Sequence, residues 1–342
     1  MDVTLLGSIW FLLWGVLWAV YFALDGYDLG LGINMPLLAA GEGERRVIYN
    51  AAGPFWDGNQ VWLITAGGVT FAAFPATYAA LFSGLYSALM LLLFALIFRG
   101  VSFEFRRLVD SDGWRRFWDL CNVLGSFLPA LLFGVAFANI FMGIPLNAQQ
   151  INEGGLLALL NPYGLAGGVL FVLLFALHGC LWLTVKADGR LQRQAAAMAA
   201  KQWLLVLLVV PVFLLLTLVY TDLFANYLRY PALLTVLLVP VAGLLAAGIS
   251  LRQGAHWRAW LASGVTIIGI TMFGVIGLYP RLLPSSLDPD FSMTIANSAS
   301  SPLTLKIMLG VALVFVPIVI AYQTWVHLKF GHKLSNYEDL RY

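Results

Sequence analysis

The stretch SIWFLLWGVLWAVYFALDGYDLGL, residues 8–31, is an apolar run whose only charged side chains, Asp25 and Asp28, come near its end. An apolar run of this length predicts a helix that crosses a bilayer, because backbone N–H and C=O groups have no water to bond in lipid. The stretch has neither the basic start nor the small-residue cleavage site of a signal peptide. We therefore expect a retained transmembrane helix.

The composition extends this expectation to the whole chain. Of 342 residues 61% are hydrophobic and 11% are charged, against about 45–50% and about 25% in ordinary globular domains. The formal charge of +2 is too small to indicate a nucleic-acid partner. Cys121 and Cys180 both lie in apolar runs, which argues against a disulfide framework or a structural zinc site. Composition thus predicts a single integral-membrane domain over residues 1–342.

Nine apolar segments are long enough to span a membrane, which predicts an all-α polytopic membrane protein. Breaks fall at Phe74-Pro75-Ala76, Pro145 and Asn161-Pro162, and in the Pro- and Ser-rich stretch from Tyr279 to Pro302. The first of these breaks predicts a tight hairpin. The predicted spans are residues 8–31, 53–73, 76–98, 118–143, 161–186, 201–221, 228–250, 257–280 and 303–327.

The distribution of basic residues predicts the orientation of these spans. All but three of the 19 Lys and Arg residues fall in alternate connections, and the exceptions are Arg229, Arg281 and Lys306. Basic loops stay cytoplasmic. We therefore expect an odd number of spans, with the N-terminus outside and the C-terminus cytoplasmic.

Carboxylates lie within or beside several spans, where a charge is costly and is by default a functional candidate. Asp25 and Asp28 are three residues apart, so a continuous helix places them on one face. Asp57 follows Pro54 in the first turn of the second span, beside Trp56, Asn59 and Gln60. The functional interpretation is a proton-conducting cluster. Helix capping, ion pairing, or helix packing through Gly26 and Gly30 is the simpler interpretation.

Other charged residues collect at the same predicted cytoplasmic boundary. Arg99 ends the third span and Glu104 follows it, so both are candidates for the same cluster, although boundary Arg and Glu residues often face lipid headgroups. Asp119 stands at the start of the fourth span, where we expect a helix cap. Together these positions predict that the acidic residues gather toward one side of the membrane.

Histidine and tryptophan bear on cofactors. Only His178 among the four histidines lies well inside a span, whereas membrane haems usually need axial His or Met ligands. We therefore expect no haem ligands in this chain, and a hydrogen-bonded core histidine rather than a metal ligand. Trp10, Trp14 and Trp18 form a stripe at four-residue spacing, typical of lipid-facing or interfacial packing. A quinone lying against this stripe is the alternative.

Three motifs make a family resemblance specific. Phe22-Ala23-Leu24-Asp25-Gly26-Tyr27-Asp28-Leu29-Gly30 and Trp56-Asp57-Gly58-Asn59-Gln60-Val61-Trp62-Leu63 closely resemble subunit II of the cytochrome bd-type quinol oxidases. A third match runs from Tyr279-Pro280 through Ser292-Met293-Thr294-Ile295-Ala296-Asn297 to Thr304-Leu305-Lys306-Ile307-Met308, and is similar to that family's last external loop and final helix. The matches span residues 20 to 310, essentially the whole chain.

The resemblance implies a nine-helix subunit of two four-helix bundles plus one peripheral helix, in the bacterial cytoplasmic (inner) membrane. It implies a partner, subunit I, that carries haems b and d and the quinol-oxidising loop. Small single-helix accessory subunits and a bound quinone are further candidates. The complex of that family oxidises quinol and reduces oxygen to water, which contributes to the proton-motive force without pumping.

Carried onto this chain, the family's cytoplasmic proton route would place Arg99 and Glu104 near the entrance, Asp57 deeper, and Asp25 and Asp28 nearby. Position 60 is Gln, where many relatives carry Glu, so a proton route through this chain would depend more strongly on the carboxyl of Asp57. A route through these residues agrees with the charge pattern read from the sequence.

Two other functions remain open from the residues. A self-sufficient proton-coupled transporter would use Asp25, Asp28 and Asp57 as its coupling site, and predicts broken helices that meet near the midplane. An inert scaffold for another membrane protein predicts that neutralising Asp57 has no effect on activity.

Overall fold

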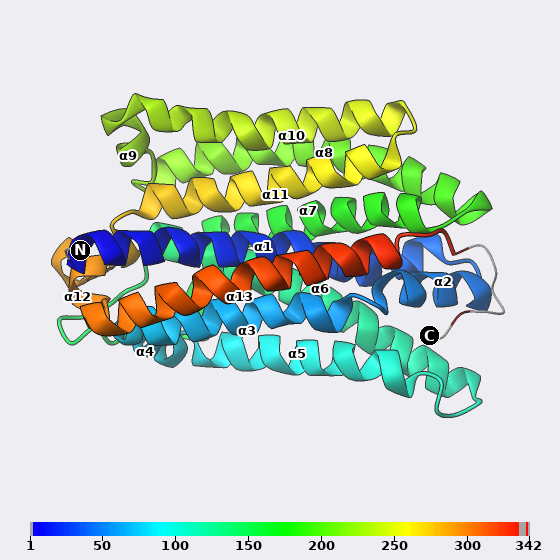
Figure 1. Ribbon diagram of the computed structural model, residues 1–342, viewed down its shortest axis with the longest axis horizontal. Helices are drawn as coiled ribbons and strands as arrows, with labels where there is room; N and C mark the ends of the chain where they lie inside the picture. The colour runs from blue at the N-terminus through cyan, green and yellow to red at the C-terminus, as the bar shows by residue number, and fades with distance from the viewer. Residues whose placement is uncertain (1–2, 335–339, 341–342) are drawn as a thin grey trace.

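Long helices running side by side form the computed structural model, which describes residues 3–334 and 340 (Figure 1). The principal helices are α1 (Val3–Leu38), α2 (Glu42–Ala52), α3 (Trp56–Ala73), α4 (Pro75–Gly84), α5 (Tyr86–Phe105), α6 (Asp112–Met142), α7 (Pro162–Lys186), α8 (Gly189–Tyr220), α10 (Thr235–Arg252), α11 (His256–Leu278) and α13 (Pro302–Lys329). Shorter elements are η1 (Leu156–Leu160), α9 (Phe224–Arg229), η2 (Pro231–Leu234), η3 (Pro289–Phe291) and α12 (Ile295–Ser298), with strands β1 (Arg281–Leu283) and β2 (Met293–Thr294). The predicted all-α class is confirmed.

Eight helical stretches in the described residues are long and apolar enough to cross a membrane. They are Leu5–Leu38, Tyr86–Phe105, Asp112–Met142, Pro162–Lys186, Gly189–Tyr220, Pro231–Arg252, His256–Leu278 and Pro302–Lys329. The chain is therefore a multi-pass membrane protein by length and composition. Nine spans and the orientation of the termini stay predictions.

The second predicted span accounts for the difference between nine and eight. It forms helix α3, which starts at Trp56 rather than residue 53. Asp57, Asn59 and Gln60 in its first turns lower its mean hydropathy, and it is not among the eight. The turn predicted around Pro75 does separate α3 from α4, and Pro75 occupies the first helical position of α4, where its missing N–H costs nothing.

Several predicted boundaries were wrong because a helix continues past its apolar core into polar sequence. The third span was predicted at 76–98, but the chain breaks at Leu85 and the apolar helix is α5, ending at Phe105. Helix α6 starts at Asp112 rather than 118, so Asp119 lies two turns inside it and is not a cap. Helix α8 starts at Gly189 rather than 201.

Helix α1 lies at the centre of the molecule, with α7, α8, α10 and α11 to one side and α3 and α5 to the other (Figure 1). Gly30 allows the closest approach, since a Cβ there would overlap the Phe175 carbonyl oxygen of α7. The tryptophan stripe faces protein rather than lipid. Trp10 Nε1 donates to Leu305 O at 3.0 Å and Trp14 Nε1 to Thr70 Oγ1 at 2.9 Å, and both rings are buried.

The two ends of the helix array differ in charge and in structure. The connections after α1, α5, α7 and α10, where most Lys and Arg residues lie, share one end with the end of α13 (Figure 1). At the other end β1 pairs antiparallel with β2, and Ile144 bridges to Ser285. The segregation of basic connections that the sequence predicts is therefore present in three dimensions.

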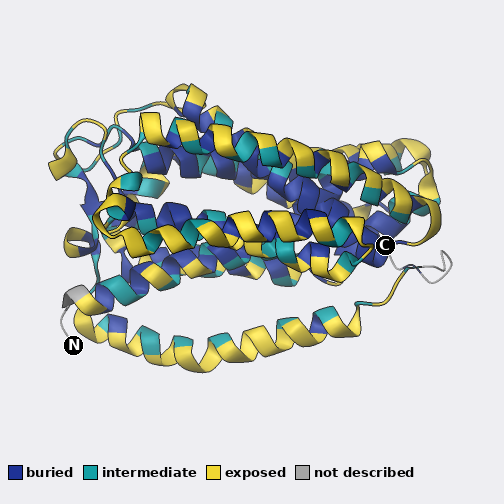
Figure 2. Cartoon of the chain, turned by 90° about the horizontal axis from the view of Figure 1, so that it is seen from above, coloured by how far each residue is buried: buried dark blue, intermediate teal, exposed yellow. Residues whose placement is uncertain are grey.

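Helix α13 stands apart from the remaining helices and is exposed along most of its length (Figure 2). Only Leu305 and Val326 of this helix are buried. Lys186 of α7 holds the segment directly after this helix by donating to the carbonyl oxygens of Phe330 and His332. The helix is thus attached chiefly near its two ends.

Candidate functional site

A buried ion pair joins the first and fifth helices. Asp25 lies on α1, and Arg99 of α5 reaches it with Nη1 at 3.2 Å from Oδ1, with both side chains almost completely inaccessible. Tyr21, one turn earlier on α1, donates its hydroxyl to Asp25 Oδ2 at 3.0 Å. A charge pair in so dry a setting needs this additional hydrogen bonding to be tolerated.

Asp28 is buried one turn further along the same helix. Asn59 of α3 donates Nδ2 to Asp28 Oδ2 at 2.7 Å and to the Tyr27 hydroxyl at 2.8 Å. The predicted helical spacing of Asp25 and Asp28 is therefore confirmed, and α1, α3 and α5 each contribute to one buried polar cluster. We call Tyr21, Asp25, Tyr27, Asp28, Asn59 and Arg99 the carboxylate cluster.

The carboxylate cluster leaves several buried polar atoms without a hydrogen bond in the described structure. They are Asp28 Oδ1, Asn59 Oδ1, Arg99 Nε and Arg99 Nη2, and Gln60 Nε2 of α3 is a further buried atom of this kind. Buried polar atoms almost always bond to protein or to ordered water. A buried polar atom without a hydrogen bond is therefore a candidate for binding an ordered water molecule or for a functional role.

Two predicted site residues lie outside the cluster. Asp57 and Glu104 are both exposed. The buried face of α3 is formed by Asn59, Trp62 and every third or fourth residue after them, so Asp57 points away. In this chain taken alone, Arg99 is buried and Asp57 is exposed, and the expected order of these residues along a proton route stays a prediction.

The predicted supporting residues have different environments. Asn59 belongs to the cluster itself, as described above. Trp56 is partly buried and stacks on Phe103 of α5, with ring centroids 5.2 Å apart and planes 7° apart. Gln60 is partly buried, with its amide nitrogen enclosed.

A second ionic cluster, at the basic end, was missed in the sequence. Arg106 is buried and donates to Glu42 through Nη1 and Nη2, both at 2.7 Å, and to Asp119 through Nε at 2.6 Å. Arg45 lies 3.7 Å from the same Asp119. This cluster fastens α2 to the end of α5 and to α6.

Electrostatics outside the spans follow from these contacts. The hydrogen bond from Arg106 lowers the pKa of the Glu42 carboxyl. Burial alone would lower the pKa of Arg106, but hydrogen bonds to Glu42 and Asp119 outweigh it and hold the pKa above its usual value. Burial raises the pKa of Tyr49, which packs against the Arg106 guanidinium.

The histidine inside a span is a hydrogen-bonded core residue. His178 is buried, with Nδ1 2.6 Å from Ser263 Oγ and Nε2 2.9 Å from Ala23 O, so both ring nitrogens are engaged within the chain. In residues 3–334 and 340 no group of three or more His, Cys, Asp or Glu side chains could hold a metal ion. Cys121 and Cys180 are free thiols.

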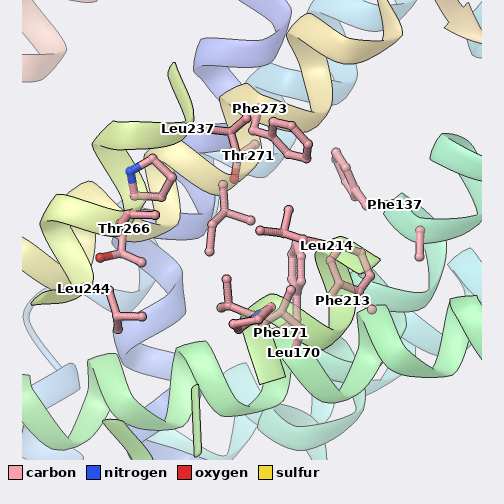
Figure 3. Close-up of a pocket in the computed structure, with 18 of the residues that line it drawn as sticks. Phe137, Leu170, Phe171, Phe213, Leu214, Leu237, Leu244, Thr266, Thr271 and Phe273 are labelled. Atoms are coloured by element: carbon pink, nitrogen blue, oxygen red, sulfur yellow. The ribbon is translucent and has the colours of Figure 1, made fainter. Parts of the chain in front are cut away.

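An apolar cavity of about 180 Å³ lies among α6, α7, α8, α10 and α11 (Figure 3). Phenylalanine, leucine and proline side chains supply most of its wall. Its hydroxyls are already bonded within their own helices, since Thr266 Oγ1 donates to Ala262 O and Thr271 Oγ1 to Ile267 O. The wall suits an apolar chain and offers few polar groups for a quinone headgroup.

Buried charges held between membrane-crossing helices place this chain in a class, the polytopic membrane proteins that carry an intramembrane acidic site. A family model for cytochrome bd terminal oxidase subunit II matches residues 6–330. The chain belongs to the cytochrome bd terminal oxidase subunit II family.

Individual relatives agree with this assignment. The chain is 36% identical to cytochrome bd ubiquinol oxidase subunit 2 of Bacillus subtilis, over 98% of this chain and 99% of the relative. It is 34% identical to cytochrome bd-I ubiquinol oxidase subunit 2 of Escherichia coli K12, over 99% of this chain and 97% of the relative. The bd oxidase structure from Geobacillus thermodenitrificans shares the fold, with a TM-score of 0.75, 18% identity, and coverage of 94% of this chain and 98% of that one.

Proposed function

We propose that this chain is the subunit of a cytochrome bd-type quinol oxidase that supplies part of a proton route for oxygen reduction. Its partner is the haem-bearing subunit I, which holds haems b and d, and the complex works in the bacterial cytoplasmic membrane. Family membership supports the assembly, and the carboxylate cluster supports the proton route. The buried Asp25–Arg99 pair, with Asp28 beside it, is the observation that carries the proposal.

Charge balance supports the binding of one proton by such a cluster. Asp25, Asp28 and Arg99 carry a net charge of −1 if both carboxyls are ionised and are neutral if one is protonated. An unbalanced charge in a dry interior costs several kcal/mol. The cluster therefore gains by taking up one proton, and a proton bound at this point can be passed on.

The unbonded polar atoms support a proton route through ordered water. Ordered waters bonded to Asp28 Oδ1, Arg99 Nη2 and Gln60 Nε2 would satisfy these groups, since buried waters typically make about three hydrogen bonds each. Such waters would connect the carboxyls despite the Gln at position 60. Asp57 and Glu104, exposed on this chain alone, would form the entrance once subunit I covers that face.

The test is Asp28→Asn in the assembled oxidase, compared with Asp290→Asn in the exposed connection at the opposite end. We expect oxygen consumption to fall about tenfold, equivalent to about 1.4 kcal/mol in the barrier, with unchanged haem content. Asp290→Asn should leave turnover unaltered. Unchanged turnover in a fully assembled Asp28→Asn oxidase would favour the scaffold function. Purification of the chain alone, without haem or subunit I, would favour a transporter.

A further inference from the structure

A line of hydrogen bonds runs from Asp28 to the last turn of the peripheral helix α13. Asn59 Nδ2 contacts Asp28 Oδ2 at 2.7 Å and the Tyr27 hydroxyl at 2.8 Å. The Tyr27 hydroxyl in turn lies 3.1 Å from His327 Nε2. His327 of helix α13 thus contacts the carboxylate cluster at Tyr27 and is connected to Asp28 through Tyr27 and Asn59.

The direction of each bond in this line is determined by its neighbours. His327 Nδ1 lies 2.8 Å from the Gln323 carbonyl oxygen, which can only accept, so Nδ1 carries the hydrogen. In a neutral imidazole Nε2 then accepts, and Tyr27 must be the donor. Because the Tyr27 hydrogen is used, its oxygen accepts from Asn59 Nδ2, whose other hydrogen is directed to Asp28 Oδ2 at 2.7 Å, with Leu24 O a longer contact at 3.2 Å.

The surroundings of His327 are mainly aromatic. Its charged neighbour is Lys186 of α7, and its titratable neighbour on α1 is Tyr27. The remaining contacts are aromatic, with the ring centroids of Phe55 at 4.7 Å and Trp260 at 6.0 Å. At the other end of the line, Asp28 faces Asp25 on its own helix, Arg99 from α5 and Asn59 from α3.

We propose that His327 is a positioning residue for Asp28, because its Nε2 accepts the Tyr27 hydrogen and thereby keeps the Asn59 amide turned with its NH₂ group toward the carboxylate. This inference rests on the proposed function of Asp28 as a proton carrier. It adds that the ionised form of Asp28 is stabilised from α13, a helix otherwise attached mainly by its ends.

Removal of the acceptor has a defined consequence. The Tyr27 hydroxyl would need another acceptor, and Asn59 Oδ1 is buried and makes no hydrogen bond in the described structure. In the wild-type structure Asn59 Nδ2 donates to both the Tyr27 hydroxyl and Asp28 Oδ2. A rotation of the amide that presents Oδ1 to the Tyr27 hydroxyl therefore also places Oδ1 beside Asp28 Oδ2. An amide oxygen repels an ionised carboxylate and accepts from a protonated one, so Asp28 would retain a proton.

Infrared spectroscopy of the assembled oxidase tests this directly. The C=O band of protonated Asp28 is identified by its loss in Asp28→Asn, and its intensity is followed with pH. In His327→Phe we expect the ratio of protonated to ionised Asp28 at a fixed pH to rise about tenfold, as for one lost hydrogen bond to a charged group. His327→Gln retains an acceptor oxygen and should keep the wild-type ratio. His327→Ala removes the same acceptor with less bulk and should match His327→Phe.

A Tyr27→Phe background isolates the mechanism from general damage. Without the hydroxyl nothing turns Asn59, so adding His327→Phe to Tyr27→Phe should not change the Asp28 ratio further. An equal rise in both backgrounds, or no rise in either acceptor-free variant, overturns the inference. Turnover of Asp28→Asn separately decides the proposed function, since unchanged turnover there refutes proton transfer without affecting the infrared result.

Discussion

Replacing Arg99 with Met removes the positive member of the buried pair while keeping much of its volume. Asp25 then retains the hydrogen bond from Tyr21 and loses its partner at 3.2 Å. Removing one partner of a buried pair typically costs about 3–5 kcal/mol, because a buried charge is left uncompensated. We expect Arg99→Met to lower the free energy of unfolding by this amount.

The double variant Asp25→Asn/Arg99→Met supplies the decisive comparison. With both charges gone the uncompensated charge disappears, so we expect a recovery of about 2 kcal/mol or more relative to Arg99→Met alone. The assay is unfolding of the assembled oxidase in mixed micelles, followed by helical circular dichroism. Arg115→Met is the matched control, since Arg115 pairs only with exposed carboxylates in the described structure, and should change little.

Two outcomes would show that Asp25 and Arg99 are not a stabilising buried pair. Arg99→Met could prove no more destabilising than Arg115→Met, which would mean that the pair is solvated in the assembled protein. Alternatively, the double variant could lose the sum of the two single losses, which would mean that Asp25 and Arg99 do not interact energetically.

Three further predictions address other parts of the chain. Asp57→Asn should slow oxygen-linked turnover while leaving quinol binding intact, as measured by steady-state kinetics with the haem content verified; equal rates would make Asp57 structural. Gly30→Ala should block the approach of α1 to α7 and cost about 2 kcal/mol or more, whereas Gly310→Ala, with open space around it, should be neutral in the same unfolding assay. Because Arg106 lowers the folded-state pKa of Glu42, its contribution is complete at neutral pH and lost as pH falls through that lowered value. The stability gap between wild type and Glu42→Gln should therefore close in acid, and a gap independent of pH would contradict this assignment.

Periodicity and composition predicted the helical class and most of the spans, because the requirement for internally bonded backbone in lipid leaves few alternatives. Helix ends were predicted less well. The residues between Asp112 and Trp118, and between Gly189 and Ala200, are polar enough to end an apolar run but remain helical. Hydropathy marks the apolar core of a span, not the point where the helix begins.

The site was predicted in part. Asp25 and Asp28 were identified because a charge in an apolar run is conspicuous, and Arg99 because it ends one. Which way a side chain faces depends on packing between helices, so the sequence could not show that Asn59 points inward and Asp57 outward. Contacts between distant segments were equally hidden, as with His327, which reaches Tyr27 across 300 positions.

Proton uptake during a single turnover reports most immediately on whether the carboxylate cluster carries protons. Fully reduced oxidase in detergent is mixed with oxygen, and a pH-sensitive dye follows uptake while haem absorbance follows oxygen reduction. We expect Asp25→Asn and Asp28→Asn to slow proton uptake about tenfold or more, the change produced by about 1.4 kcal/mol in the barrier, while oxygen binding keeps its wild-type rate. Proton uptake at the wild-type rate in both variants would show that the protons take a route that does not involve the carboxylate cluster.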